Sequence, residues 1–417
     1  VPPGKHGRMT ASARDSDLVV FGATGFVGKL LAAYLAEHAP AGTRIALAGR
    51  SPARLEQARA ALPSAAADWP LIEADASDPA SMAALAAGTR VVVTTVGPYA
   101  RYGMPLVEAC AAAGTHYADL TGEVLFVRDA IDRVDAVARG TGAKIVHACG
   151  YDSIPSDLSA MLLAARAAAD GAGGLLEVTL AASLKGGFSG GTIDSMRAQM
   201  EALDADPSLR KVAGHPFALS PDRAAEPKTQ QPKDAGLPAR LPDGRWSAPF
   251  VMASFNTRIV RRSNALQDWA YGRGFSYGEV MAVGRGPVGA LSAAGVTGGL
   301  LGAMTAMSFG PTRSLMDRVL PAPGTGPSEE VRRAGWFRMD VEASTESGRR
   351  YTAVAAGKGD PGYAATAVML GESALALALD GDRLPDRSGS LTPATALGEV
   401  LVERLRAAGH TYEVAPA

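Results

Sequence analysis

The sequence is poor in the residues that build metal centres and disulfide frameworks. It contains two cysteines, Cys110 and Cys149, and six histidines among its 417 residues. Two cysteines do not make a disulfide framework, so we expect a reducing, cytoplasmic setting. No histidine stands at metal-ligand spacing from a cysteine or from another histidine, and we therefore predict that the protein holds no metal.

Net charge is almost absent as well. The 41 lysines and arginines nearly balance the 42 aspartates and glutamates, which leaves a formal charge of −1. Because no excess of positive charge favours nucleic acid, we predict no nucleic-acid partner. The first residues also lack the apolar core of a signal peptide, and we expect residues 1–16 to form a disordered leader.

Glycine is abundant, and one glycine-rich run predicts a binding site. The run 22–28 reads Gly-Ala-Thr-Gly-Phe-Val-Gly, follows an apolar segment at 17–21 and opens a segment of helical spacing. Gly22 would allow the tight turn, Gly25 the approach of a pyrophosphate, and Gly28 the packing of helix on strand. The alternative is a glycine-rich turn without a ligand. The residues predicted to hold a dinucleotide here are Gly22, Thr24, Gly25, Phe26, Val27 and Gly28.

The end of the second apolar segment, 44–50, indicates which dinucleotide is bound. A carboxylate at this point would bind the ribose hydroxyl of NAD, but Arg50 and Ser51 stand there instead. Arg50 would pair with a 2′-phosphate, unless it is an ordinary surface arginine. We therefore predict NADP, as NADPH, in preference to NAD. The adenine end is expected at Asp75 and Ala76, and the nicotinamide end at Thr95, Val96, Gly97 and Pro98.

Strand-like and helical segments alternate through residues 17–150. Apolar runs rich in β-branched residues alternate with segments of helical spacing, a pattern typical of a parallel sheet that is buried on both faces. We predict a Rossmann-like, doubly wound parallel sheet, of fold class α/β, for this first domain. The expected strands are 17–21, 44–50, 71–75, 90–96 and 144–149, and the expected helices 28–37, 51–61 and 105–113.

After residue 150 the pattern changes, and residues 151–360 are predicted to form a second, α+β domain with a mostly antiparallel sheet. Residues 335–344 and 350–356 have strand-like patterns, and the Glu346-Ser347-Gly348 turn between them indicates a β-hairpin. A further strand is expected at 176–184. The remaining expectations are a long loop at 204–249 and, at 361–417, C-terminal helices that pack back on the first domain.

Residues 286–312 contain no charged side chain. Three interpretations of this segment remain open. It would be long enough to cross a membrane; it would also suit an element that lies on a membrane surface; or it is an ordinary buried helix pair, broken at Gly298-Gly299. The third interpretation includes a subunit interface, which would make the protein a homodimer.

The same glycine spacing occurs in short-chain reductases, but their catalytic pair is missing. Those enzymes use a tyrosine and a lysine four residues later, and none of the ten tyrosines here has a lysine at that offset. Polar residues at the strand ends on the cofactor side remain, because ligands of open α/β sheets bind there. We select Tyr99, Tyr151 and Arg101 as catalytic candidates, although each would also serve to satisfy a turn. We expect Cys149 to be a structural thiol.

The chain resembles the saccharopine dehydrogenase-like oxidoreductases. Within that family it is most similar to the mycobacterial trans-acting enoyl reductases, and the resemblance covers nearly all of the chain from Asp17 on. The motifs that carry the resemblance are the glycine loop, 96–99, 117–123, 149–157, the specific run 255–266, 269–273 and 323–328.

This resemblance implies an enzyme that acts in trans with a polyketide synthase and reduces a carbon–carbon double bond in phthiocerol-type envelope lipids. The acyl or polyketide substrate would be held on a carrier protein, and the enzyme would lie at the inner face of the plasma membrane, which the uncharged run would suit. Tyr99 and Tyr151 would donate hydrogen bonds to the enolate, with Arg101 or Arg258 as electrostatic support. The cluster of Arg258, Arg261 and Arg262 would meet a phosphopantetheine arm or an acidic carrier protein, unless it belongs to a solvated edge strand.

Two other classes of function stay open. One is a saccharopine-type reductase of another substrate, such as an imine, which would need carboxylate-binding arginines in its cleft. The other is a non-catalytic dinucleotide-binding protein that is held at a membrane.

Overall fold

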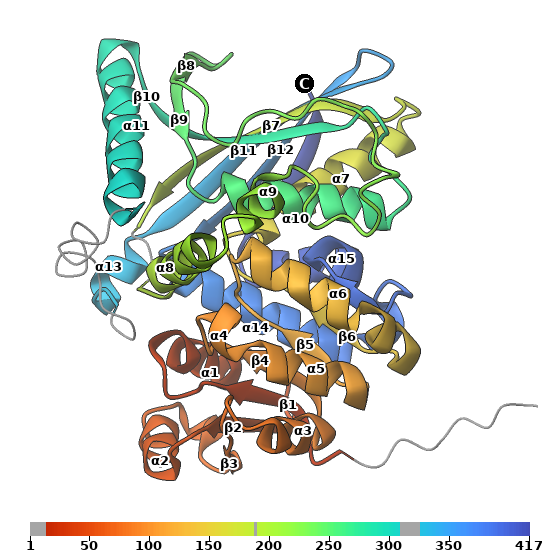
Figure 1. Cartoon of the computed structure of the whole chain (residues 1–417). Coiled ribbons are helices and arrows are strands. Elements are labelled where there is room, and N and C mark those ends of the chain that lie inside the picture. Colours follow the sequence, from red (N-terminus) through yellow and green to blue (C-terminus); the bar gives the residue numbers. More distant parts are fainter. Residues whose placement is uncertain (1–13, 187–189, 309–325) are drawn as a thin grey trace, which may run out of the picture.

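The computed structural model describes residues 14–186, 190–308 and 326–417. Of the expected leader 1–16, residues 1–13 lie outside the described residues, and Ser16 already opens the first strand. The described chain is built around two seven-stranded sheets, one in the lower and one in the upper half of Figure 1.

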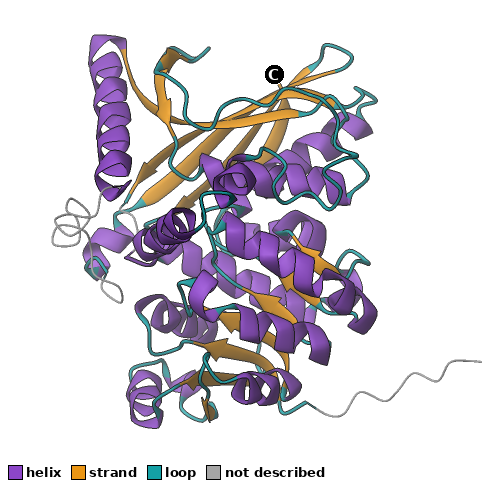
Figure 2. Ribbon diagram, viewed as in Figure 1, coloured by secondary structure: helices purple, strands orange, loops and turns teal. Residues whose placement is uncertain are grey.

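The first sheet is parallel throughout and has the strand order β13-β6-β5-β4-β1-β2-β3. Helices cover both of its faces (Figure 2), as a doubly wound sheet requires. The strands are β1 (Ser16–Phe21), β2 (Ile45–Gly49), β3 (Leu71–Glu73), β4 (Thr89–Thr94), β5 (His116–Ala118), β6 (Lys144–Val146) and β13 (Gly389–Leu391). The helices that connect them are α1 (Phe26–His38), α2 (Pro52–Ala60), α3 (Pro79–Ala87), α4 (Tyr99–Tyr102), α5 (Met104–Ala113) and α6 (Val124–Thr141), with a 3₁₀ turn at Ser64–Ala66.

The second sheet has the order β14-β12-β11-β7-β10-β9-β8, and only its β7–β10 pair is parallel. The predicted fold class, a Rossmann-like sheet plus a mostly antiparallel second sheet, is thereby confirmed. The predicted hairpin is formed by β11 and β12, with Gly348 at a φ of 82° in its turn. The strands are β7 (Leu175–Lys185), β8 (Ala239–Arg240), β9 (Arg245–Pro249), β10 (Ser276–Arg285), β11 (Trp336–Thr345), β12 (Arg350–Lys358) and β14 (Thr411–Pro416). The helices of this half are α7 (Ile154–Ala169), α8 (Gly190–Ala205), α9 (Leu209–Gly214), α10 (Ala253–Leu266), α11 (Gly286–Ser308) and α13 (Glu329–Arg333).

The C-terminal segment belongs to both halves of the molecule. Helix α14 (Ala364–Leu379) packs against α1 and β4, and α15 (Pro393–Ala407) packs against α7 and α14. Besides these helices and a 3₁₀ turn at Gly381–Arg383, the segment contributes β13 to the first sheet and β14 to the second. The two short strands are absent from the sequence-based expectation because three to six residues carry little periodicity.

The core explains why residues 18–21 of the first strand are all apolar. All six residues of β1 are buried; Leu18 and Val20 pack into one core, while Val19 and Phe21 pack into another on the opposite face. Alternate side chains of a strand point to opposite faces, so the part of a strand that is covered on both sides is apolar at successive positions. The first of these cores continues into the second sheet and joins the two halves.

Two expectations for the second half are wrong. Residues 253–266 form helix α10 rather than an edge strand, and all but two of its residues are buried. The uncharged segment is not a helix pair broken at Gly298-Gly299, because α11 runs through both glycines; residues 309–312 lie outside the described residues. Nor is α11 buried, since Val288 and Leu291 are 76% and 75% exposed. Within the described parts of the chain, no helix has both the length and the apolar character that a membrane crossing needs.

Candidate active site

The glycine loop between β1 and α1 has the backbone of a phosphate cradle. Gly22 has a φ of 91°, and a Cβ on Gly28 would lie 2.1 Å from the Gly22 carbonyl oxygen, so the helix begins in direct contact with the loop. Gly25 precedes α1 with no side-chain cap, and the first turn of the helix contains no acidic residue. The first N–H groups of a helix have no acceptor within it, and they carry partial positive charge. The loop therefore fits a dinucleotide pyrophosphate.

The adenine end of the predicted site lies at the ends of β2 and β3. Arg50 is exposed directly after β2, and Ser51 caps α2 by accepting from the Arg54 N–H at 3.4 Å. Hydrogen bonds from Ser77 hold the pKa of the Asp75 carboxyl below its usual value, and the nearby charge of Arg50 adds to this. Arg50 forms no hydrogen bond or ion pair with the described residues, and it lies at the strand end where a 2′-phosphate would be expected.

The nicotinamide end of the predicted site opens into a cavity. Thr95 lies beside the glycine loop, and its hydroxyl donates to the Gly22 carbonyl at 3.3 Å. Thr95, Gly97 and Pro98 all contribute to the cavity wall, together with Gly25 of the glycine loop. This wall brings together two segments that the sequence predicts to bind one cofactor.

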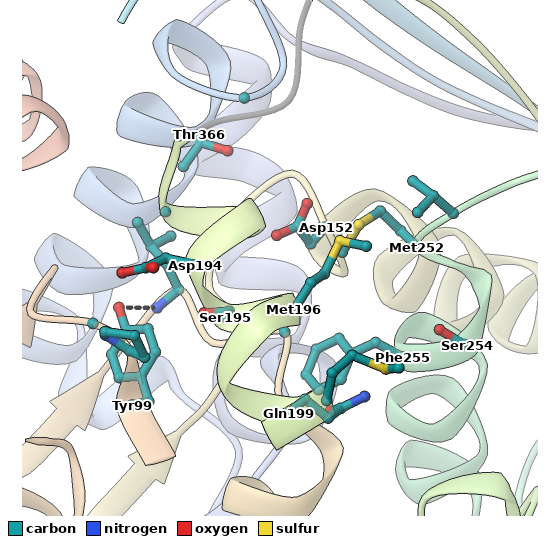
Figure 3. Close-up of a pocket in the computed structure, with 18 of the residues that line it drawn as sticks. Tyr99, Asp152, Asp194, Ser195, Met196, Gln199, Met252, Ser254, Phe255 and Thr366 are labelled. Atoms are coloured by element: carbon teal, nitrogen blue, oxygen red, sulfur yellow. Dashed lines mark hydrogen bonds between the residues drawn. The ribbon is translucent and has the colours of Figure 1, made fainter. Parts of the chain in front are cut away.

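The cavity has a volume of about 520 Å³ and reaches from the glycine loop into the second half of the molecule. Figure 3 shows that much of its wall comes from α8 and from the start of α10. Leu300 and Thr305 of α11 add a third side, so the helix that is exposed on its outer face also borders the cavity. The apolar side chains in the wall include Phe26, Leu120, Met196, Met200, Phe250, Val251, Met252, Phe255 and Leu300.

Among the described residues, five titratable side chains line the cavity, and none is a lysine, arginine or histidine. Four of the five are engaged with the protein. The engaged groups and their partners are Tyr99 (Thr94 and Leu120), Asp194 (Arg197), Asp234 (Thr257 and Arg258) and Tyr363 (Gly190). The fifth, Asp152, accepts no hydrogen bond and forms no ion pair within the described chain. Burial raises the pKa of its carboxyl to about 6.

Tyr99 lies in the cavity wall, but its hydroxyl is occupied. The hydroxyl donates to the Thr94 carbonyl at 3.2 Å. It also accepts from the Leu120 N–H at 3.1 Å, which is the dashed line in Figure 3. Burial is the main cause that raises the pKa of Tyr99 well above its usual value. The buried carboxylate of Glu123 holds the start of α4 in place, because it accepts a hydrogen bond from the Tyr99 N–H. The same carboxylate accepts from the Ser195 hydroxyl and so links α4 to α8. Tyr99 therefore helps to shape the cavity wall, and its hydroxyl is not placed to donate a proton to a ligand.

The other two catalytic candidates of the sequence lie elsewhere. Tyr151 is only 4% exposed, and its ring packs edge-on against Phe337 of the second sheet, 5.2 Å between centroids. Arg101 lies outside the cavity wall and pairs with Glu201 of α8 at 2.5 Å. These contacts suit structural roles, and neither side chain is positioned to touch a ligand in the cavity.

The arginines of α10 are not available to a carrier protein. Arg258, Arg261 and Arg262 are 2–4% exposed and are held inside the molecule. Arg258 pairs with Asp234, and Arg262 donates to the Leu219 and Ser390 carbonyls, the latter at 2.6 Å. Desolvation lowers the pKa of Arg262 to about 10. The expectation that these arginines meet a phosphopantetheine arm is therefore wrong.

The thiol and imidazole that the sequence places near each other serve the core. His147 and Asp119 form a buried pair at 2.7 Å, and Cys149 is fully buried. The pKa of Cys149 lies well above its usual value, mainly because burial removes water from the thiolate. Since the thiolate is the reactive form, this thiol is a poor nucleophile.

The sequence-based reasoning missed α8, which supplies Asp194, Ser195, Met196 and Gln199 to the cavity. The apolar residues Ile193, Met196 and Met200 recur at helical spacing and would have indicated a helix with one apolar face.

Comparison with known proteins agrees with this geometry. Residues 18–146 match the family model described as the saccharopine dehydrogenase NADP binding domain. A trans-acting enoyl reductase of Mycobacterium bovis is 48% identical over 411 residues, which cover 96% of this chain and 98% of the relative. A Mycobacterium tuberculosis protein that carries the same name provisionally is 53% identical over 412 residues, with the same coverage.

The chain belongs to the trans-acting enoyl reductase family. The recognition made from the sequence is confirmed, and so is the assignment as an oxidoreductase with a domain that binds NADP. The fold is also that of saccharopine dehydrogenase (L-Glu forming) from Saccharomyces cerevisiae, with a TM-score of 0.56 at 12% identity over 96% of this chain and 99% of that one.

Proposed function

We propose that this member of the trans-acting enoyl reductase family uses NADPH to reduce a carbon–carbon double bond of an acyl thioester. The observation that carries this proposal is the cavity wall, which is mostly apolar and, among the described residues, contains no arginine or lysine. A long acyl chain gains about 0.8 kcal/mol for each methylene that it buries in such a cavity. Carboxylate-bearing substrates of the imine or amino-acid type would lack a cation there, which favours the enoyl thioester over them.

The residues of the chain fit the cofactor that this reaction needs. Bound NADPH supplies a hydride to the double bond. The loop from Gly22 to Gly28 would hold the pyrophosphate, and Arg50 with Ser51 would hold the 2′-phosphate, which favours NADP over NAD. Thr95 and Pro98 would position the nicotinamide at the inner end of the cavity. The apolar wall excludes water from the reacting carbons.

The finer assignments rest on the relatives. Their names say that they act in trans, which supports a chain held by a separate synthase. We propose a polyketide or fatty-acyl intermediate of a phthiocerol-type lipid as substrate, a carrier protein of a polyketide synthase as partner, and the inner face of the plasma membrane as the site of action. The exposed apolar residues of α11 (Val288, Leu291 and Leu301) would suit either a membrane surface or a homodimer contact.

The proposal is tested by following NADPH oxidation with an α,β-unsaturated acyl thioester as acceptor. We expect turnover that is faster with longer acyl chains and faster with NADPH than with NADH. An imine acceptor serves as the comparison. Turnover of the imine alone would assign a saccharopine-type reaction, and NADPH binding without turnover of any acceptor would assign a non-catalytic protein.

A further inference from the structure

One carboxyl group in the cavity has no hydrogen-bond or ion-pair partner among the described residues. Asp152 follows β6 and precedes α7, and Figure 3 shows its side chain in the cavity wall. In the first sheet, β6 lies two strands beyond β4, on the side away from β2 and Arg50. The carboxyl ends of parallel strands meet at one edge, so Asp152 shares the edge on which Gly97 and Pro98 stand. All three residues border the same cavity.

Asp152 differs from the other titratable side chains in the cavity wall, because they already have partners within the protein. The other titratable side chains in the wall donate to, or accept from, backbone or charged partners. Asp152 differs from Asp157, five residues later, which accepts from the Ser263 hydroxyl and the Ala394 N–H outside the cavity. A carboxyl that the described residues leave unpaired at a cavity surface is available to interact with whatever fills the cavity.

The raised pKa of the Asp152 carboxyl also suits a group that donates a proton. Burial alone raises the pKa of Asp152 to about 6, because the ionised form loses its hydration. An acyl chain that fills the cavity displaces further water and raises the pKa again. The carboxyl is then protonated in a useful fraction of molecules near neutral pH, as a general acid must be.

We propose that Asp152 protonates the substrate carbon next to the thioester during reduction of the double bond. This inference rests on the enoyl reductase function proposed above. The β-carbon of the substrate receives a hydride from NADPH, and the electron pair of the double bond moves toward the thioester carbonyl. The α-carbon then takes the proton of the Asp152 carboxyl, so that a C–H bond forms as the O–H bond breaks. Water returns a proton to the Asp152 carboxylate before the next turnover.

The test compares Asp152→Asn with wild type and with the control variant Asp382→Asn, which changes an exposed aspartate that does not line the cavity. Asparagine keeps the shape of the side chain but has no acidic proton. We expect kcat of Asp152→Asn to fall roughly 100-fold while KM and NADPH affinity stay near the wild-type values. We also expect the wild-type kcat to fall as the pH rises through the pKa of the acid, and this dependence to vanish in the variant.

A second readout needs neither cofactor nor turnover. Infrared difference spectra of the free protein, recorded as the pH is changed, should contain a protonated-carboxyl band with a midpoint near pH 6 that Asp152→Asn lacks and Asp382→Asn keeps. Full activity in Asp152→Asn, or a variant spectrum equal to that of wild type, would overturn the inference. The proposed function fails separately, if the wild-type enzyme reduces no enoyl thioester, and the role of Asp152 then fails with it.

Discussion

The contact between Gly28 and the phosphate loop gives the sharpest prediction. In Gly28→Ala, the new Cβ would lie 2.1 Å from the oxygen and 2.8 Å from the carbon of the Gly22 carbonyl. Both atoms belong to the backbone, so no side chain is able to rotate away. Restoring an ordinary contact distance requires the start of α1 to move by roughly 1 Å. Overpacking of this kind costs about 1–3 kcal/mol, and the better helix propensity of alanine returns at most about 1 kcal/mol.

Gly25→Ala is the matched control because the same substitution meets little of the protein there. Gly25 has a φ of −75°, which any residue adopts, and its Cβ would contact only the Gly22 carbonyl oxygen at 3.3 Å. The residue is exposed, however, and lines the cavity. The added methyl group would therefore occupy the space through which a pyrophosphate approaches the loop.

The assay measures thermal unfolding without cofactor and NADPH affinity by fluorescence titration. Gly28→Ala should lower both the stability, by about 1–2 kcal/mol, and the affinity, because the displaced helix carries its amides away from the phosphates. Gly25→Ala should melt close to wild type and yet bind NADPH at least roughly tenfold more weakly. If Gly25→Ala bound NADPH as tightly as wild type, the loop would not be the cradle of the cofactor. A Gly28→Ala protein of wild-type stability would refute the packing argument.

Three further predictions address the specificity, the stability and the substrate channel. Arg50→Glu should weaken NADPH binding about 10- to 100-fold while NADH binding changes little, because only NADPH carries the 2′-phosphate; equal losses for both cofactors would remove Arg50 from that role. Desolvation raises the folded-state pKa of Asp157 from 3.8 to about 7, so the stability that its neutral form provides is full below pH ~4 and is lost as the pH rises toward 7. Asp157→Asn should therefore flatten the fall of unfolding free energy across this range by up to about 1.4 kcal/mol per pH unit in urea titrations, and an unchanged slope would contradict the assignment. Met196→Trp, which narrows the cavity at α8, should raise KM for long acyl thioesters about tenfold and leave KM for short ones unchanged, because displacing two methylenes costs about 1.6 kcal/mol. An equal rise of KM for all chain lengths would place the acyl chain elsewhere.

Much of the first half of the fold was predictable because its signals are local. A strand that is buried on both faces must be apolar at every position, and a loop that turns sharply into a helix needs glycine where a side chain would collide. Residues 18–28 show both requirements, and the structure places the end of β1, the loop and the start of α1 there. The hairpin of β11 and β12 followed in the same way from its alternation and from Gly348.

The second half was harder to predict because its signals depend on distant partners. A run such as 255–266 contains arginines and polar residues that suit a solvated strand, yet α10 is buried. Arg258 pairs with an aspartate 24 residues away in the chain, and Arg262 donates to carbonyls 43 and 128 residues away. Periodicity within the run does not reveal such partners.

The same division applies to the candidate site. The sequence by itself predicted where a dinucleotide would bind, because a glycine-rich loop and an arginine at a strand end are features of short segments. Only the tertiary structure decided which of two adjacent polar residues reaches the cavity. Tyr151 turns into the core against Phe337, whereas Asp152 lines the cavity, because α7, which follows both residues, packs against the second sheet.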